Sequence, residues 1–187
     1  MSMPTARLRL VPWVPAHLLA LIEAPDRFEE RSGFRTADGL REFLVSDDVS
    51  PAWVAALRGA AAADPWVFGF AVVHLESQQV IGSAAFKGPP DADGRAEIAY
   101  GIAPGFQGQG YATEAAAALV AYAQADSRVR TIVAHTMPAP GPSPEVLRKC
   151  GFAFVGEVED PEDGRVWRWE RASEPGARPD PRSTPAS

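Results

Sequence analysis

The chain has 187 residues, enough for one domain with a full hydrophobic core, and its 46% hydrophobic and 22% charged residues exclude a disordered or fibrous protein. A formal net charge of −6 disfavours a nucleic-acid partner, and apolar runs far below the ~20 residues of a bilayer span predict a soluble, cytoplasmic protein without a membrane partner. A single cysteine excludes an intramolecular disulfide, and three histidines without ligand spacing give no sign of a metal.

The first third of the chain predicts one strand followed by helices. Residues 6–11 alternate Arg7 and Arg9 with Leu8 and Leu10, which is the pattern of a half-buried strand. Residues 15–23 carry leucine and isoleucine at helical spacing. Two weaker helical segments follow at 40–45 and 51–63, and Pro51 is well placed to open the second.

The middle and last thirds predict strands around two further helices. Strands at 66–75, 80–86 and 95–102 read as a meander, and an alanine-rich helix follows from 111 to 124. A strand at 129–135 must lie parallel to 95–102 if the three segments form a strand–helix–strand crossover. A short helix at 143–150, stopped by Gly151, precedes a closing hairpin of residues 152–158 and 165–171.

This order predicts an α+β fold, in which a mixed, mostly antiparallel sheet of about seven strands is flanked by about four helices. Residues 1–171 form the predicted domain. Residues 172–187 contain four prolines and no aliphatic side chain larger than alanine, so they predict a disordered, proline-rich tail.

The segment with the clearest chemistry is the glycine loop 105–110, Gly-Phe-Gln-Gly-Gln-Gly, between a strand and the helix that opens at Tyr111. The first amides of a helix have no intrahelical acceptor and lie at the positive end of its dipole, so a phosphate is a natural ligand. Tyr111 stands where a Walker loop needs lysine, and Thr113 stands where the dinucleotide fingerprint needs glycine. Both nucleotide motifs are therefore excluded.

The segment Gln107-Gly-Gln-Gly-Tyr-Ala112 instead matches the pattern Gln/Arg-x-x-Gly-x-Gly/Ala. On this motif the chain resembles the GNAT superfamily of acetyl-CoA-dependent N-acetyltransferases, and within it the ribosomal-protein N-terminal acetyltransferases. A weaker match runs from His135-Thr-Met-Pro to the Cys-Gly-Phe that ends at residue 152, so the likeness covers about residues 95 to 152. It implies direct transfer of acetyl from acetyl-CoA to a primary amine through a tetrahedral intermediate, by a monomer or homodimer.

By that resemblance, Ile102 and Ala103 lend backbone groups to the pantetheine arm of the coenzyme. The residues implied at its pyrophosphate are Gln107, Gly108, Gln109, Gly110, Tyr111, Ala112 and Thr113.

Two side chains are the catalytic candidates. Glu97 matches a carboxylate that assists deprotonation of the amine in many GNAT proteins, and its alternative role is an exposed strand residue balancing Arg95. Ser143 matches a serine near the leaving sulfur, and its alternative role is a helix N-cap followed by Pro144. Two positions depart from the family pattern: Pro140 replaces a pantetheine-binding asparagine, and Leu147 replaces a tyrosine used as an acid.

Other functions remain open at this point. The two departures favour, as an alternative, a non-catalytic acyl-CoA-binding regulatory module on the same fold. The acceptor amine could also be a polyamine or an aminoglycoside. Residues 25–63 fit a cationic acceptor or an ordinary solvated surface, because they contain Asp26, Glu29, Glu30, Asp38, Glu42, Asp47 and Asp48. His135 could line the acceptor site or be a satisfied strand-end histidine, and Cys150 is predicted to be a buried structural thiol.

Overall fold

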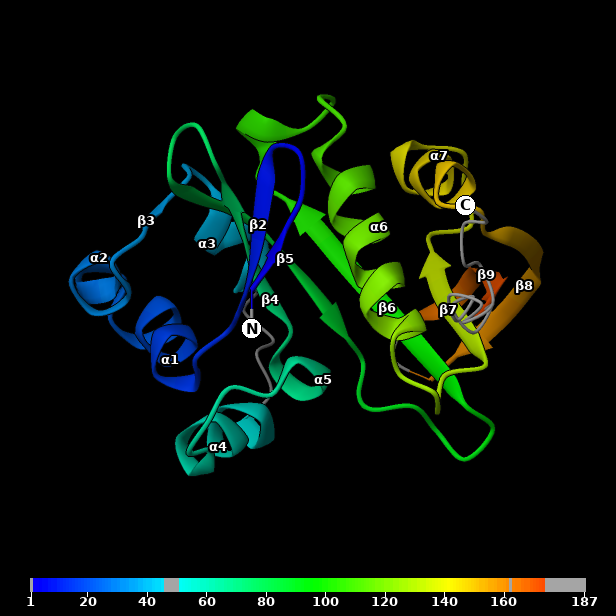
Figure 1. Ribbon diagram of the computed structural model, residues 1–187, viewed down its shortest axis with the longest axis horizontal. Helices are drawn as coiled ribbons and strands as arrows, with labels where there is room; N and C mark the ends of the chain where they lie inside the picture. The colour runs from blue at the N-terminus through cyan, green and yellow to red at the C-terminus, as the bar shows by residue number, and fades with distance from the viewer. Residues whose placement is uncertain (1, 46–50, 162, 174–187) are drawn as a thin grey trace, which may run out of the picture.

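A computed structural model describes residues 2–45, 51–161 and 163–173 (Figure 1). The strands are β1 (Met3–Pro4), β2 (Leu8–Pro12), β3 (Arg35–Thr36), β4 (Phe70–His74), β5 (Gln79–Phe86), β6 (Arg95–Ile102), β7 (Thr131–Thr136), β8 (Ala153–Asp160) and β9 (Gly164–Ala172). The α-helices are α1 (Pro15–Glu23), α2 (Phe28–Ser32), α3 (Leu40–Leu44), α4 (Pro51–Gly59), α5 (Pro65–Phe68), α6 (Tyr111–Gln124) and α7 (Pro142–Lys149), and short 3₁₀ turns are η1 (Pro25–Arg27) and η2 (Pro104–Phe106).

The strands form one sheet in the order β1-β2-β4-β5-β6-β7-β9-β8, with β3 beside the start of β5. Neighbouring strands are antiparallel except for the β3–β5 and β6–β7 pairs, which are parallel. The mixed, mostly antiparallel sheet and the parallel β6–α6–β7 crossover are therefore confirmed. Within the described residues the sheet has nine strands, more than the seven expected, because β1 and β3 are too short to leave a periodic pattern.

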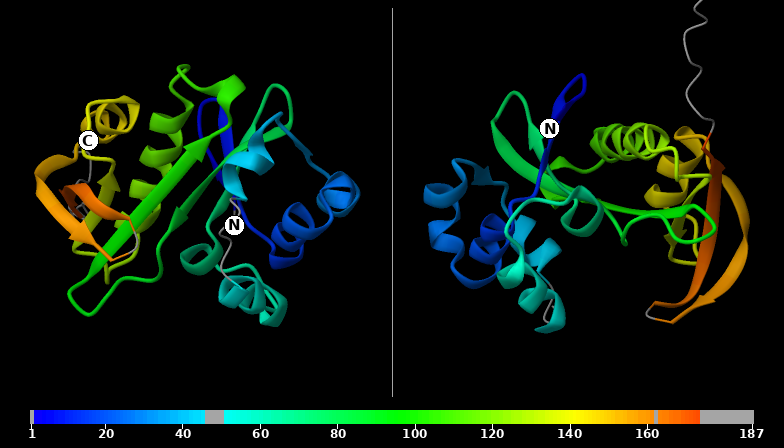
Figure 2. Two further views of the ribbon diagram at one scale, coloured as in Figure 1. Left: turned by 180° about the vertical axis from the view of Figure 1, so that it is seen from behind. Right: turned by 60° about the horizontal axis from the view of Figure 1, so that its bottom comes forward.

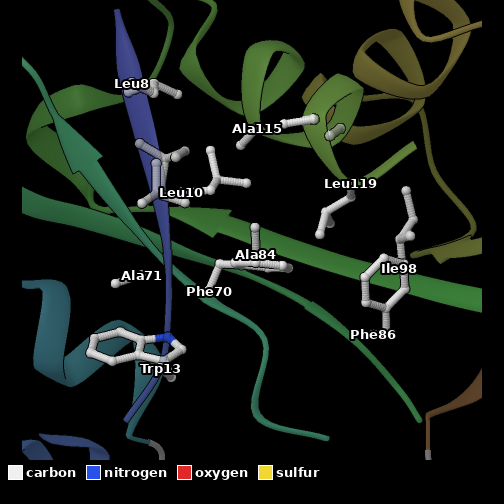
Figure 3. Packing of buried hydrophobic residues seen from close by; sticks show 14 of the residues in the cluster. Leu8, Leu10, Trp13, Phe70, Ala71, Ala84, Phe86, Ile98, Ala115 and Leu119 are labelled. Atoms are coloured by element: carbon white, nitrogen blue, oxygen red, sulfur yellow. The ribbon is translucent and has the colours of Figure 1, made fainter. Parts of the chain in front are cut away.

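Helices cover both faces of the sheet (Figure 2). Helix α6 lies on one face with α7 beside it, and α1 to α4 gather on the other. The main core lies between α6 and the sheet, where Leu8, Leu10, Phe70, Ala115 and Leu119 are fully buried (Figure 3). Alanines on the buried face of α6 let its backbone approach the sheet closely, so that its N-terminus is held beside the end of β6.

Several predicted boundaries differ from the structure, and two of the differences have a clear local cause or consequence. The strand expected at 66–75 begins only at Phe70, because the Asp64 carboxylate caps a helical turn, α5, by accepting from the Trp66 amide at 2.9 Å. The helix expected to open at Ser143 begins at Pro142, with Gly141 as its N-cap. The predicted role of Ser143 as an N-cap is therefore incorrect, and its hydroxyl is not committed to capping the helix.

Some expectations concern residues that the structure does not describe. Residues 174–187, which make up most of the predicted tail, and the acidic pair Asp47 and Asp48 lie outside the described ranges. In the part that is described, no helix combines the length and the apolar composition needed to cross a bilayer.

Candidate functional site

The site opens where β6 and β7 separate. These parallel strands are paired only at Arg95–Thr131, Ala96–Ile132 and Glu97–Val133, although β6 continues to Ile102 and β7 to Thr136. Strand β7 pairs with β9 along its whole length and so stays in the sheet. Beyond Glu97, the edge of β6 that faces β7 is therefore not paired to it, and its backbone groups are available to a ligand.

A cavity of about 540 Å³ lies between the end of β6, the glycine loop and α7. Its wall consists of Tyr100, Gly101, Ile102, Phe106, Gln107, Gly108, Gly110, Tyr111, Ala112, Thr113, Pro142, Ser143, Glu145, Val146 and Lys149. The volume falls within the usual range for a small-molecule or cofactor pocket.

The glycine loop places unoccupied backbone amides in this cavity. Gly108 and Gly110 have φ of +75° and +84°, in the left-handed region that glycine adopts without strain. Gly110 is the N-cap of α6 and makes no side-chain capping bond, so the helix dipole and the first amides of α6 are free to hold an anion. The Gln107 side chain fastens the loop to β6 by donating from Nε2 to the Ile102 carbonyl at 2.8 Å.

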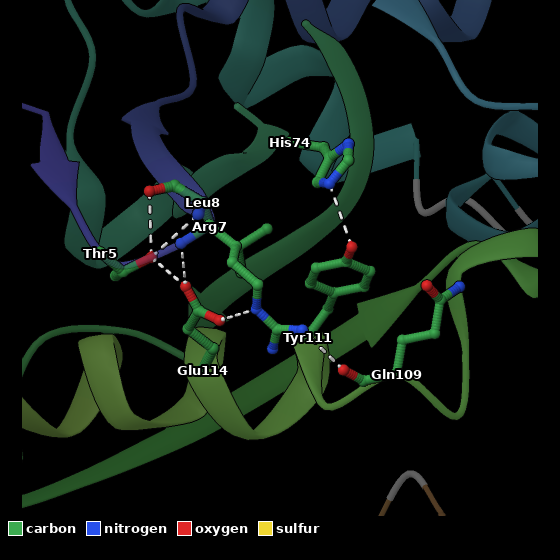
Figure 4. A network of polar contacts seen from close by, with 7 residues as sticks. All are labelled: Thr5, Arg7, Leu8, His74, Gln109, Tyr111 and Glu114. Carbon is green, nitrogen blue, oxygen red and sulfur yellow. Dashed lines mark hydrogen bonds and ion pairs between the residues drawn. The ribbon is translucent and has the colours of Figure 1, made fainter. Parts of the chain in front are cut away.

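The turn between β1 and β2 holds the loop from its other side (Figure 4). The Glu114 carboxylate accepts from Thr5 Oγ1 (2.6 Å), Arg7 N (2.7 Å) and Arg7 Nε (2.9 Å). A further nitrogen of the Arg7 guanidinium donates to the Gln109 carbonyl at 2.9 Å, and the group lies 4.5 Å from the centre of the Tyr111 ring. Glu114 thus points away from the cavity and anchors the first turn of α6 to the β1–β2 turn.

The Tyr111 side chain is held by a buried hydrogen bond to His74, the last residue of β4. His74 Nδ1 accepts from the Ser77 amide at 3.3 Å, so Nε2 carries the hydrogen and donates to the Tyr111 hydroxyl at 3.0 Å. Both rings are less than one-tenth exposed. The first residue of α6 is therefore locked to the core.

The cavity brings together most of the residues predicted to bind the coenzyme. Ile102, Gln107, Gly108, Gly110, Tyr111, Ala112 and Thr113 line it. Gln109 is not in the wall and instead gives its carbonyl to Arg7. Ala103 is fully buried, and its amide donates to the Ile81 carbonyl at 2.8 Å, so that amide is already used within the sheet.

A second cavity of about 180 Å³ adjoins the first. Its wall consists of Lys87, Glu97, Ile98, Ala99, Tyr100, Ala134, His135, Thr136, Ser143, Leu147 and Asp163. Tyr100 and Ser143 line both cavities, which places them where the two spaces meet. Burial, with a smaller contribution from the nearby Cys150 thiol, raises the pKa of the Tyr100 phenol, so it stays protonated at neutral pH.

Glu97 does not balance Arg95, which pairs instead with Asp93 at 2.6 Å. One Glu97 oxygen accepts from His135 Nδ1 at 3.0 Å and lies 3.1 Å from Lys87 Nζ. Because a carboxylate only accepts, His135 carries its hydrogen on Nδ1. Glu97 and His135, two candidates from the sequence, therefore meet in the smaller cavity, and Ser143 faces the same space.

Two residues of this cavity escaped sequence reasoning. Lys87 lies 3.6 Å from Asp163, which is in the turn between β8 and β9. Burial alone would lower the pKa of Lys87, but its hydrogen bond to Glu97 and the charges of Glu97, Asp160 and Asp163 raise it, so it remains an ammonium. In the sequence, Lys87 and Asp163 each follow a strand and look like ordinary charged surface residues. They come together only because of the order in which the strands assemble into the sheet.

The structure also bears on the acidic segment 25–63, on Cys150 and on metal-ligating side chains. Neither cavity has a lining residue from 25–63, so the acidic residues described there, such as Glu29 and Glu30, do not face this site. Cys150 is buried as predicted, and burial raises the pKa of its thiol. Among the described residues, no group of three or more metal-ligating side chains gathers.

Comparison with known proteins relates this arrangement to a family. A family model described as an acetyltransferase (GNAT) domain matches residues 7–153, well over half of the chain. The chain belongs to the GNAT acetyltransferase family. A curated relative, the uncharacterized N-acetyltransferase p20 of Bacillus licheniformis, is 30% identical over 96 residues. That match covers 51% of this chain and 54% of the relative, so the chain matches only about half of the relative's length.

Solved structures share the GNAT fold at low sequence identity. A GNAT-family acetyltransferase from Bacillus anthracis has a TM-score of 0.62 and 16% identity, over 92% of this chain and 99% of that chain. RimL, a ribosomal L7/L12 α-N-protein acetyltransferase in complex with coenzyme A, has a TM-score of 0.63 and 18% identity, over 92% and 98%. A ribosomal-protein-S5-alanine acetyltransferase from Vibrio fischeri has 0.64 and 14%, over 93% and 97%. The predicted GNAT fold is thereby confirmed.

Proposed function

We propose that this chain transfers an acetyl group from acetyl-CoA to a primary amine, either a protein N-terminal α-amine or a small-molecule amine. The observation that carries the proposal is the junction of the two cavities at Tyr100 and Ser143. One cavity offers free amides at a glycine loop, and the other offers a carboxylate and an imidazole. A thioester lying at the junction would face an amine entering from the smaller cavity.

The larger cavity supplies the groups that the coenzyme needs. Amides from Gly108 to Thr113, with the positive end of the α6 dipole, suit its diphosphate. The edge of β6 that is unpaired beyond Glu97 suits the amides of the pantetheine arm, which would add to the sheet like a short strand. Pro140 has no amide hydrogen to donate, so in this proposal β6 carries the pantetheine contacts.

The chemistry then requires no protein nucleophile. The neutral amine attacks the thioester carbonyl carbon, its C–N bond forms, and the tetrahedral intermediate expels the sulfur as the C–S bond breaks. The amine loses one proton and the sulfur gains one. The Ser143 hydroxyl and the Tyr100 phenol lie at the junction, where either can donate to the departing sulfur.

Glu97 suits binding and orienting the amine better than strong proton abstraction. Its carboxylate already accepts from His135 and lies beside the Lys87 ammonium, so its acceptor positions are partly occupied before an amine arrives. An α-amine of pKa ~7.8 costs only ~0.5 kcal/mol to deprotonate near pH 7.4, whereas a lysine-like amine of pKa ~10.4 costs ~4 kcal/mol. An α-amine acceptor therefore needs little help from this carboxylate.

Calorimetric titration with acetyl-CoA tests the coenzyme site. Ala112→Glu adds a carboxylate in the first turn of α6, where the helix tolerates it but the diphosphate would be repelled. Ala117→Glu is the matched control, because Ala117 is exposed on the same helix. We expect loss of binding only in Ala112→Glu. No binding by the unaltered chain at millimolar acetyl-CoA, or equal binding by both variants, would overturn this placement of the coenzyme.

Turnover separates transfer from simple binding. Release of the coenzyme thiol in the presence of peptides with free α-amines supports the proposed reaction. Firm acetyl-CoA binding without acetylation across a broad amine panel would instead support the non-catalytic acyl-CoA-binding module.

A further inference from the structure

The smaller cavity has three fixed charges in its wall. The Lys87 ammonium lies 3.1 Å from a Glu97 oxygen and 3.6 Å from an Asp163 oxygen. The three side chains come from separate segments: Lys87 follows β5, Glu97 is in β6, and Asp163 is in the β8–β9 turn. Within the wall, two carboxylates and one ammonium leave one uncompensated negative charge. A third carboxylate, Asp160, also acts on Lys87 but lies outside the wall, where it accepts from the Asp163 amide at 3.0 Å.

The rest of this wall does not change that balance. Among the described residues, no other Asp, Glu, Lys or Arg lines the cavity. The His135 Nδ1 hydrogen is already donated to Glu97. Ile98, Ala99, Ala134 and Leu147 supply apolar surface. An acceptor that enters therefore meets a small, partly apolar space with a single negative charge to neutralise.

We propose that Lys87 sets the charge of this pocket so that it accepts an amine carrying one positive charge and discriminates against acceptors with a second ammonium close by. This inference rests on the proposed acetyl transfer. A single ammonium is matched by the one uncompensated carboxylate. A second ammonium would find no free carboxylate in the wall and would be repelled by Lys87.

Lys87 contributes a lasting positive charge to the pocket and is not itself acetylated. Its carboxylate neighbours raise its pKa and keep it protonated, so it has no lone pair for attack on a thioester. The cavity of about 180 Å³ equals the liquid volume of only about six waters at ~30 Å³ each. That space fits the reacting end of an acceptor, such as an α-amine with a small side chain, and the rest of a longer acceptor must lie outside it.

Two matched peptides test the charge rule. Alanyl-norleucine amide and alanyl-lysine amide share the reacting α-amine and differ by one side-chain ammonium. Coenzyme thiol release gives kcat/KM for each peptide at low ionic strength, and mass spectrometry verifies that the α-amine is acetylated. We expect the unaltered chain to prefer the norleucine peptide. Lys87→Met should shift this preference toward the lysine peptide by about fivefold, the upper range for a partly exposed ion pair.

Three further variants test the direction of the charge effect and supply a control. Lys87→Arg keeps the charge and should keep the preference. Asp163→Asn removes the uncompensated charge, so it should lower kcat/KM for both peptides and most strongly for the lysine peptide. Arg165→Met removes a positive charge from the same hairpin outside the cavity wall and should leave the preference unchanged. Salt at 0.5 M should reduce the effect of Lys87→Met, which a purely structural role would not predict.

The outcomes distinguish this inference from the proposed function. If both peptides are acetylated and Lys87→Met has the same preference as the unaltered chain, the charge rule is wrong while acetyl transfer stands. If acetyl-CoA binds but no variant acetylates either peptide, the proposed transfer fails and the charge rule fails with it.

Discussion

Replacing Glu114 with glutamine tests how the turn between β1 and β2 holds the glycine loop. One oxygen of Glu114 accepts from Thr5 Oγ1 and the Arg7 amide, and the other accepts from Arg7 Nε. Glutamine has the same shape but only one oxygen. If that oxygen keeps the first two donors, the amide nitrogen faces Arg7 Nε, so two donors oppose each other and the ion pair is lost.

The expected loss of stability follows from these contacts. A hydrogen bond to a charged group contributes about 1.5–3 kcal/mol when it is shielded. The Glu114 side chain is 15% exposed, but that of Arg7 is 47% exposed, so solvent screens the pair and reduces its contribution. We expect Glu114→Gln to lower the free energy of unfolding at neutral pH by about 1–2 kcal/mol, which in a chain of this size lowers Tm by ~3–6 °C.

The pH dependence gives this prediction a second readout. Burial would raise the pKa of Glu114, but the hydrogen bonds from Thr5 and Arg7 and the charge of Arg7 lower it. A carboxyl group whose pKa is depressed on folding adds stability above its unfolded pKa, ~4.3, and this stability is lost as the pH falls through the folded pKa. The gap between the unaltered chain and Glu114→Gln should therefore be widest at neutral pH and narrow in acid.

Urea unfolding at pH 7 and pH 3.5 measures both effects. Glu159→Gln is the matched control, because its side chain is 77% exposed on β8, and it should change stability by less than ~0.5 kcal/mol. A loss for Glu114→Gln no larger than for the control, or a loss equal at the two pH values, would refute this account of the network.

Three other substitutions have clear expected outcomes. A Cβ on Gly82 would overlap the backbone of β6 and lie 2.8 Å from an isoleucine methyl group, so Gly82→Ala should lower the free energy of unfolding by more than ~2 kcal/mol in thermal melts. Gly59→Ala is the control, because its Cβ would meet open space and should cause no loss, and equal losses in the two variants would contradict this prediction. Tyr111→Phe leaves the buried His74 donor unpaired and should lower the free energy of unfolding, measured in urea, by about 1–3 kcal/mol. No loss would contradict the assigned hydrogen bond. Glu97→Gln should slow acetylation of an α-amine peptide less than about tenfold, and a thousandfold loss would identify an obligate base.

The sequence was sufficient to predict the half of the site that is made of backbone. Strand β6 (Arg95–Ile102) and helix α6 (Tyr111–Gln124) have the bounds that their patterns predict. Their signals are local, because alternation, an alanine-rich periodic run and a glycine directly before the helix each depend on neighbouring residues. Gly110 was identifiable for this reason, since a left-handed residue at a helix start favours glycine.

The half of the site made of side chains depends on long-range pairing and was only partly predictable. Glu97 was found through family likeness, but its ion pair with Lys87 was not, because the exact register of β5 against β6 places the Lys87 amide on the Glu97 carbonyl and brings the two side chains together. Asp163 reaches Lys87 only after β8 and β9 join the sheet. The start of α7 was also not predictable to the residue. Its N-cap is Gly141, two residues before the expected Ser143, so the Ser143 hydroxyl is available to the cavities.

The partners of Glu97 also bear on which acceptor the proposed reaction can use. Along β6 the nearest opposite charge is Arg95, two residues away, which would leave Glu97 on an open surface with water as its main contact. In the folded chain Arg95 is held by Asp93, and Glu97 is held by Lys87 and His135. A carboxylate held between these two groups can bind an ammonium, but the proposed attack needs the neutral amine. Without a strong base, the acceptors that the proposed reaction can use are amines already partly neutral at physiological pH, and α-amines have this property while alkyl amines do not.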